Sequence, residues 1–194
     1  MVFPFVLFIG ISVFYLIYFA KQRMLRKQGI TANRLAKGSK PAKTAAIETC
    51  LLVVTYGMAL VQYASVFFSV HMLPFSLPAV LRWIGAGIMA CGICFFLLAV
   101  IVMRDSWRAG VDESQSTAIV TSGVYKVSRN PAFVGFDLLY IGSALVMPNV
   151  LLWGLALVGV VLLHLQILEE EKFLCRAFGE EYVQYLSKTP RYFL

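Results

Sequence analysis

Residues able to take part in chemistry are gathered in two stretches of an otherwise apolar chain. The first runs from Thr117 to Gly135, TAIVTSGVYKVSRNPAFVG, and is the longest polar, turn-rich passage. Asn130 is a favourable helix N-cap and Pro131 a favourable first helical residue, so we predict that a helix begins at Pro131. The free N–H groups of its first turn could bind an anionic or oxygen-rich ligand group. The structural alternative is a re-entrant membrane loop.

The second stretch runs from Leu168 to Tyr185, LEEEKFLCRAFGEEYVQY. At 1.5 Å per residue from Val150, Glu170 lies about 30 Å along a helix, at the membrane surface where Pro131 is also expected. The adjacent carboxylates of Glu169 to Glu171 could be a solvated helix end or ligand-binding groups, and we favour ligand binding. Gln166 lies one turn before Glu170 on the same face.

Asp137 is an ionisable residue inside a predicted membrane span. Such a residue is a functional candidate by default, although Asp137 is close enough to the helix start to reach the interface. On a helix, Phe133, Asp137 and Tyr140 share one face. We therefore expect a polar and aromatic stripe that continues from the loop into the helix bundle.

Composition identifies the class of protein. The chain is 60% hydrophobic and 14% charged, with a mean hydropathy of +0.79, which is typical of an integral membrane protein. About 20 apolar residues are needed for one helical span. We predict an all-α protein with five transmembrane helices, the last two forming a tight hairpin, over the ranges Val2–Ala20, Ile47–Val70, Ala79–Met103, Phe133–Met147 and Val150–Leu168.

The basic residues predict the orientation in the membrane. The chain has 17 Lys and Arg, and nearly all lie in three segments, 21–43, 104–129 and 172–191, which the positive-inside rule places in the cytoplasm. The N-terminus is then outside, while the active site and the C-terminus are cytoplasmic. The net charge of +7 indicates topology and contact with anionic membrane lipids, and does not indicate nucleic-acid binding.

The predicted elements divide into two regions. Residues 1–103 form a three-helix transmembrane scaffold with a basic cytoplasmic loop at 21–46, and residues 104–194 form the catalytic region. That region comprises a cytoplasmic loop (104–130), a helical hairpin (131–168) and a C-terminal cytoplasmic helix (169–194). Four glycines in the scaffold are available for close helix contacts: Gly57, Gly85, Gly87 and Gly92.

We expect no metal site. The chain has only two histidines, and Cys91 and Cys94 lie within an apolar helix without a second cysteine pair. These two cysteines are expected to be small buried residues.

Two motifs together resemble a known family. The pattern T-S-G-V-Y-x-x-x-R-x-P-x-F-x-G begins at Thr121, and E-E-x-x-L-x-x-x-F-G-x-x-Y-x-x-Y begins at Glu170. In this order they resemble the isoprenylcysteine carboxyl methyltransferase family and its phospholipid methyltransferase relatives. The first three helices match only in hydropathy.

The resemblance implies a membrane-embedded methyltransferase that uses S-adenosyl-L-methionine and releases S-adenosyl-L-homocysteine. The cofactor would lie between the last two helices and their flanking loops, on the cytoplasmic side. The acceptor would be the carboxylate of an isoprenylcysteine-like lipid that enters from the bilayer. Carried over by position, the cofactor contacts are Thr117, Ala118, Ile119, Val120, Tyr125, Asn130, Pro131, Ala132, Phe133 and Glu170.

This chain departs from the family pattern at two positions. Asn130 replaces a histidine, and Gln166 replaces a basic residue that contacts the substrate in the relatives. Arg129 is a candidate to bind the acceptor carboxylate instead, so Arg129 and Glu170 are our catalytic candidates. The substrate candidates are Gln166, Asp137 and Tyr140.

The expected reaction is direct in-line methyl transfer to an acceptor oxygen, with the protein acting by positioning. A carboxylate is already ionised near neutral pH and needs no general base. The nearer alternative is methylation of a phospholipid or another lipid amine. A more distant one is a small membrane transporter.

Overall fold

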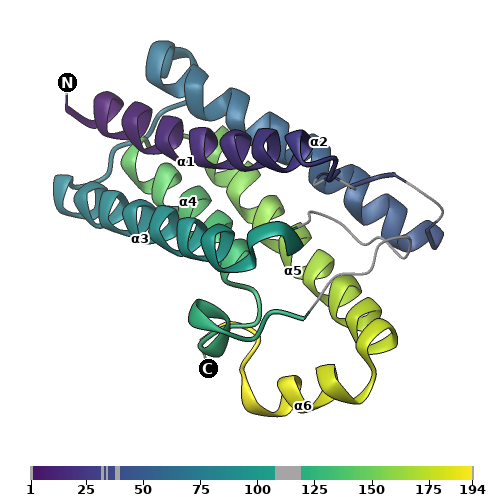
Figure 1. Ribbon diagram of the computed structural model, residues 1–194. Helices are drawn as coiled ribbons and strands as arrows, with labels where there is room; N and C mark the ends of the chain where they lie inside the picture. The colour runs from purple at the N-terminus through teal and green to yellow at the C-terminus, as the bar shows by residue number, and fades with distance from the viewer. Residues whose placement is uncertain (1, 32, 34, 38–39, 108–118, 194) are drawn as a thin grey trace.

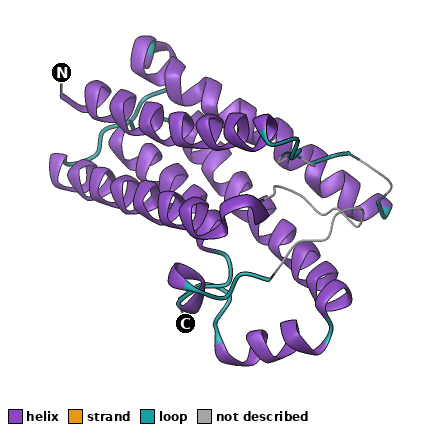
Figure 2. Cartoon of the chain, in the orientation of Figure 1, coloured by secondary structure: helices purple, strands orange, loops and turns teal. Residues whose placement is uncertain are grey.

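The structure is a computed structural model that describes residues 2–31, 33, 35–37, 40–107 and 119–193. Within these ranges the secondary structure is helical and contains no β-strand (Figures 1 and 2). The helices are α1 (Val2–Lys27), α2 (Ala42–Phe67), α3 (Ala79–Met103), α4 (Pro131–Val146), α5 (Val150–Phe178) and α6 (Glu180–Lys188), with short 3-10 helices η1 (Ser69–His71), η2 (Arg104–Ser106) and η3 (Gly123–Lys126).

Four of these helices, α1, α2, α3 and α5, are long and apolar enough to cross a membrane. They indicate an integral membrane protein, as the composition predicted. The apolar α4 is shorter, with 16 residues. The predicted loop at 21–46 was too long, because α1 continues through its basic end to Lys27 and α2 already begins at Ala42. The connection therefore spans only 28–41.

Helices α3 and α4 are in backbone contact along a line of glycines, which we call the glycine seam: Gly85 and Gly92 on α3, Gly135 and Gly142 on α4. A Cβ added to Gly92 would lie 2.8 Å from the carbonyl oxygen of Gly135, and one added to Gly142 would lie 2.7 Å from that of Gly85. Such distances exclude any larger residue unless the helices separate. The prediction of close helix contacts at Gly85 and Gly92 is confirmed.

Other small residues of the scaffold do not lie at helix contacts. A Cβ added to Gly57 or Gly87 would meet no atom within 4 Å, so the prediction was wrong at these two positions. Cys91 and Cys94 are exposed on α3 and are not the buried residues that we expected. An apolar helix can present such residues to lipid, which a hydropathy pattern does not distinguish from a helix contact.

The connection between α4 and α5 is a tight hairpin, as predicted. Asn149 is the N-cap of α5, and its Oδ1 accepts the Leu152 N–H at 2.9 Å. Its Nδ2 donates to Ser65 Oγ at 3.0 Å, which attaches the hairpin to α2. The Val150 N–H donates to the Leu73 carbonyl. The hairpin tip is thereby held against the connection between α2 and α3.

The C-terminal part returns to the start of α4. Helix α5 continues past the predicted boundary at Leu168 and ends at Phe178, before Gly179, which has a φ of 55°. This left-handed conformation favours glycine and allows the sharp turn into α6. The tail (residues 189–193) then runs back from α6 to η3 (Figure 1).

Candidate functional site

Helix α4 begins at Pro131, as the sequence predicted. Asn130 occupies the N-cap position, but its side chain makes no capping hydrogen bond, so this part of the prediction was wrong. The hydrogen bonds that its side chain makes are donated by the amide nitrogen. Asn130 Nδ2 donates instead to the Arg191 carbonyl oxygen at 3.3 Å and approaches Glu171 Oε1 at 3.5 Å.

Beside the start of α4 lies an ion cluster formed by Arg129, Glu171 and Arg191, here called the Glu171 cluster. Glu171 Oε1 accepts from Arg129 Nε at 3.2 Å and Nη2 at 2.9 Å. Glu171 Oε2 accepts from Arg191 Nε at 3.1 Å and Nη2 at 2.7 Å. The Glu171 carboxylate raises the pKa of Arg191, so that guanidinium remains charged. The cluster joins three segments that are distant in sequence.

The remaining donor group of Arg129 is also engaged. Its Nη1 donates to the carbonyl oxygens of Leu186 and Thr189, and its backbone N–H donates to the Pro190 carbonyl at 3.0 Å. Only 9% of the Arg129 side chain is exposed. The geometry therefore directs this guanidinium toward α5 and the C-terminal residues.

The element η3 is held by α6 in a similar way. Tyr185 Oη donates to the Tyr125 carbonyl at 2.6 Å. Burial raises the pKa of Tyr185 to about 12, so its hydroxyl stays neutral and can donate. Burial, followed by the neighbouring Tyr185 and Glu170, also raises the pKa of Tyr125.

A small cavity of about 70 Å³ lies between the start of α4 and the end of α5, facing α1 and α2. Gln166 Nε2 donates to Glu170 Oε1 at 3.1 Å and to Glu48 Oε1 at 3.3 Å. The buried Gln166 Oε1 has no hydrogen-bond partner within the described residues. The cavity wall combines four residues predicted from sequence: Ala132, Phe133, Gln166 and Glu170.

Glu48 is a residue that sequence reasoning missed. It lies on α2, is fully buried, and accepts from Lys40 Nζ and from the Ala36 N–H at 2.8 Å. The available signal was a carboxylate near the start of an apolar helix, since such residues are costly in a membrane and are often functional. Through Gln166, Glu48 connects the segment between α1 and α2 to the small cavity.

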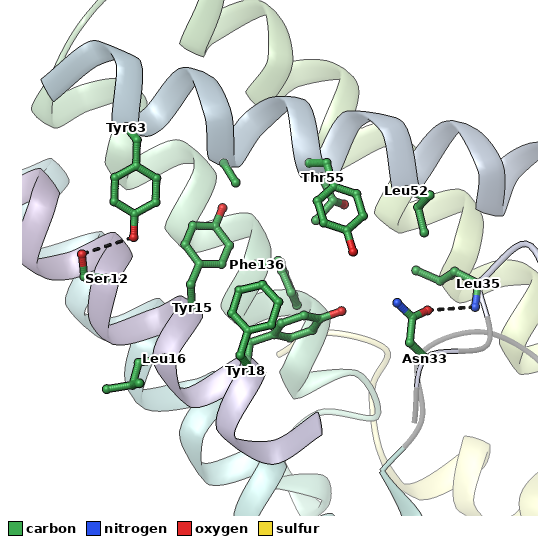
Figure 3. A pocket seen from close by; sticks show the side chains of 13 residues that line it. Ser12, Tyr15, Leu16, Tyr18, Asn33, Leu35, Leu52, Thr55, Tyr63 and Phe136 are labelled. Carbon is green, nitrogen blue, oxygen red and sulfur yellow. Dashed lines mark hydrogen bonds between the residues drawn. The ribbon is translucent and has the colours of Figure 1, made fainter. Parts of the chain in front are cut away.

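A larger cavity of about 320 Å³ lies between α1 and α2 (Figure 3). Asn33 and Leu35, from the basic connection, line one end of it. Leu16 and Tyr56 also line it and are 70% and 57% exposed on the outer surface, so the cavity opens between these helices. It adjoins the small cavity, and four residues line both: Tyr18, Leu35, Thr55 and Phe136.

Several predicted site residues lie elsewhere. Tyr140 is fully buried and its ring packs against Phe136 and beside Gly159, away from the lining of both cavities. Asp137 also lines neither cavity, and its Oδ1 is buried without a partner among the described residues. Ile119 and Val120 are half-buried. Two predicted cofactor contacts, Thr117 and Ala118, lie outside the described residues.

The described residues contain no group of three or more His, Cys, Asp or Glu side chains arranged to hold a metal ion. The polar residues that line the small cavity include Gln166 and Glu170, whose side chains carry amide and carboxylate oxygen atoms. They can bind ligand groups that carry hydrogen-bond donors.

Comparison with known proteins relates this geometry to a family. The chain is 39% identical over 80 residues to protein-S-isoprenylcysteine O-methyltransferase of Xenopus laevis, covering 41% of this chain and 28% of that protein. It is 26% identical over 164 residues to protein-S-isoprenylcysteine O-methyltransferase B of Arabidopsis thaliana, covering 74% and 83%. The Schizosaccharomyces pombe protein-S-isoprenylcysteine O-methyltransferase is 35% identical over 75 residues, covering 37% and 31%.

The first and third alignments cover less than a third of those relatives. A sequence model of the phospholipid methyltransferase family matches residues 80–181, which is more than half of the chain and includes the first motif and most of the second, which extends to Tyr185. The resemblance to isoprenylcysteine carboxyl methyltransferases is thereby confirmed, and the chain belongs to the phospholipid methyltransferase family.

Proposed function

We propose that this protein is an integral membrane methyltransferase that uses S-adenosyl-L-methionine to methylate the carboxylate of an isoprenylcysteine-like acceptor. The observation that carries the proposal is that the two cavities adjoin and share part of their lining. The polar end at Gln166 and Glu170 lies next to the start of α4, while the apolar end opens between α1 and α2. A molecule with a charged head and a long apolar tail matches this arrangement.

The residues of the small cavity fit the proposed cofactor. The Glu170 carboxylate and the unpaired Gln166 Oε1 can accept hydrogen bonds from its hydroxyl or amino groups, and the Phe133 ring can face a cation. When bound, S-adenosyl-L-methionine supplies an electrophilic methyl group on a sulfonium. Tyr125, Asn130 and Pro131 remain proposed cofactor contacts because they lie at or near the start of α4. Four more are proposed from their positions in the family motif: Thr117, Ala118, Ile119 and Val120.

The volumes divide the work between the two cavities. Pockets for whole ligands usually measure about 300–1,000 Å³, so the larger cavity of about 320 Å³ can hold a lipid tail. The smaller one of about 70 Å³ has room for the reacting groups of the acceptor and the cofactor, and not for the whole cofactor. The acceptor carboxylate is ionised near neutral pH. The protein therefore has to exclude water and align the attacking oxygen, and it needs no general base.

We assign Arg129 a positioning role. Its guanidinium is occupied by Glu171, Leu186 and Thr189, which supports a function in holding the start of α4 over direct contact with the acceptor carboxylate. Glu170 remains the catalytic candidate that faces the cavity. Asp137 and Tyr140 line neither cavity, so they would affect the substrate only indirectly, through the residues that line the cavities.

The proposed orientation places the cofactor site and the C-terminus in the cytoplasm and the N-terminus outside, with α4 as a fifth span. At 1.5 Å per residue, α4 is about 24 Å long, shorter than the hydrocarbon core of about 30 Å. The turn after α4 is hydrogen-bonded to α2 and to the connection between α2 and α3. Protein groups, and not water, therefore bond the backbone where this helix ends. The acceptor would enter from the bilayer and the cofactor from the cytoplasm.

Methylation of a phospholipid amine is the second candidate. The polar end is rich in acceptors, with Glu48, Glu170 and Gln166 Oε1 close together, and such a site would also suit an ammonium head group. The discriminating experiment supplies the purified protein in detergent with methyl-labelled cofactor and either N-acetyl-S-farnesylcysteine or phosphatidylethanolamine.

A methyl ester releases labelled methanol in base, whereas an N-methyl group does not. We expect base-labile label with the farnesylcysteine and little transfer to the phospholipid. Base-stable label on the phospholipid alone would refute carboxyl methylation. Calorimetric binding of S-adenosyl-L-homocysteine tests the cofactor separately, and no binding under these conditions would contradict the methyltransferase proposal as a whole.

A further inference from the structure

The larger cavity has a closed end as well as an open side. Ser12 Oγ and Tyr63 Oη lie 3.2 Å apart and join α1 to α2 at the end opposite Asn33 and Leu35 (Figure 3). Next to this pair the Phe8 ring packs edge-on against the Tyr63 ring, with the ring centroids 6.1 Å apart. In hydrocarbon the two hydroxyls have no water to bond instead, so their separation is unfavourable.

A buried hydrogen-bond chain fixes the helices at this level. Tyr15 Oη donates to Gln62 Oε1 at 2.7 Å, and Gln62 Nε2 donates to Ser143 Oγ at 2.9 Å. The chain joins α1, α2 and α4, and its members are buried. Because these three helices are connected beside Ser12 and Tyr63, the closed end cannot move along the bundle without breaking the connection.

The length of the larger cavity can be compared with isoprenoid tails. Leu52 and Tyr63 both line it, and eleven helical steps of 1.5 Å separate them by about 17 Å. An extended chain advances roughly 1.2 Å per bond, as in an extended polypeptide. A fifteen-carbon isoprenoid, with about twelve such bonds, is then about 14 Å long, and a twenty-carbon one, with about sixteen, is about 19 Å long.

We infer that the Ser12–Tyr63 pair is a length stop, which makes fifteen-carbon acceptors better substrates than twenty-carbon ones. The inference rests on the proposed function and specifies its substrate. A twenty-carbon tail would have to separate the pair or bend outward past Leu16 and Tyr56 at the open side. Both responses reduce the number of contacts that position the carboxylate at the small cavity.

The test measures kcat/KM for N-acetyl cysteine thioethers with ten-, fifteen- and twenty-carbon isoprenoid tails. We expect the wild type to prefer fifteen carbons over twenty by at least about fivefold. Tyr63→Ala opens the closed end and should bring the two within about twofold. Leu60→Ala is the matched control, because Leu60 lies on the same helix, is 71% exposed and does not line the cavity.

The ten-carbon acceptor reports on folding and chemistry, since it does not reach Tyr63. If Tyr63→Ala fails to fold, Tyr63→Leu provides a milder opening with an intermediate ratio. Equal use of fifteen and twenty carbons by the wild type, or an unchanged ratio in a Tyr63 variant that still methylates the ten-carbon acceptor, would overturn the length stop alone. Methylation of none of the three acceptors would instead refute the proposed function, and the length stop with it.

Discussion

Replacing Glu171 by alanine is expected to destabilise the folded protein by about 3–5 kcal/mol, the range for removing one partner of a buried ion pair. The side chains of Glu171 and Arg129 are each only 9% exposed. The substitution therefore leaves the Arg129 guanidinium buried without its counter-ion. Arg191 is 35% exposed and can turn to solvent, so Arg191→Ala should cost less, about 1–2 kcal/mol after solvent screening.

The matched control is Glu169→Ala on the same helix. Glu169 also contacts basic residues, but the side chains of Lys43 and Lys172 are 71% and 63% exposed. Its Oε2 accepts one further bond, from the neutral Thr44 hydroxyl at 2.8 Å, whose loss should cost about 1 kcal/mol. Exposed ion pairs contribute about 0–1 kcal/mol. The free energy of unfolding can be measured by titrating sodium dodecyl sulfate into mixed micelles while following helical circular dichroism.

Cofactor affinity provides a second measurement on the same variants. Because the Glu171 cluster holds the start of α4, we expect Glu171→Ala and Arg191→Ala to weaken S-adenosyl-L-homocysteine binding, whereas Glu169→Ala should not. A loss of stability below about 1 kcal/mol for Glu171→Ala, or an equal loss for Glu169→Ala, would refute the distinction between buried and exposed pairs.

The remaining predictions concern the cofactor seat, the acceptor and the glycine seam. Glu170→Ala should weaken cofactor binding by about 1.5–3 kcal/mol in calorimetry, and affinity within twofold of wild type would exclude it as a contact. Asn130→Leu should lower thermal stability and cofactor affinity because the Arg191 carbonyl loses a donor, whereas Asn130→His should be tolerated; equal behaviour of both variants would contradict this. The methylation rate should be flat between about pH 6.5 and 8.5, because a C-terminal carboxyl acceptor titrates near pH 3.5 and is ionised throughout this range. An amine acceptor titrates near pH 10, so a steep rise in rate at constant cofactor affinity would favour an amine. Gly92→Ala should lower the free energy of unfolding by about 1–3 kcal/mol through overpacking, while Gly87→Ala should leave it unchanged. A larger loss for Gly87→Ala would show that the contact with α4 lies on the other face of α3.

Local signals in the sequence predicted much of the fold. The Asn130-Pro131 pair marked the start of α4, and the gap between the predicted spans, at residues 148 and 149, marked the hairpin. Each depends on backbone geometry at one or two residues. The sequence also predicted that Phe133 and Glu170 lie at the same level of the bundle, because the predicted hairpin returns the chain by about the length of one span.

Contacts that depend on side-chain competition could not be predicted in this way. The Asn130 amide nitrogen donates to the Arg191 carbonyl of the tail, a contact that local helix signals do not indicate. Helical spacing places Glu170 and Glu171 on different faces, but it does not show that Glu171 meets two arginines while Glu170 faces Gln166. Glu48 was missed because its partners come from a connection that was read only as a determinant of topology.

The glycine seam has a consequence for how this protein can change in evolution. It joins α3 to α4 at backbone distance, and both helices lie within the family match at 80–181. The larger cavity is built mainly from α1, α2 and their connection, which precede that match. The helices around the proposed cofactor site are thus packed together as one unit, whereas the walls of the larger cavity, the proposed lipid site, can diverge. Exchanging residues 1–78 between relatives would then transfer the preference for a lipid tail without rebuilding the seat of the methyl donor.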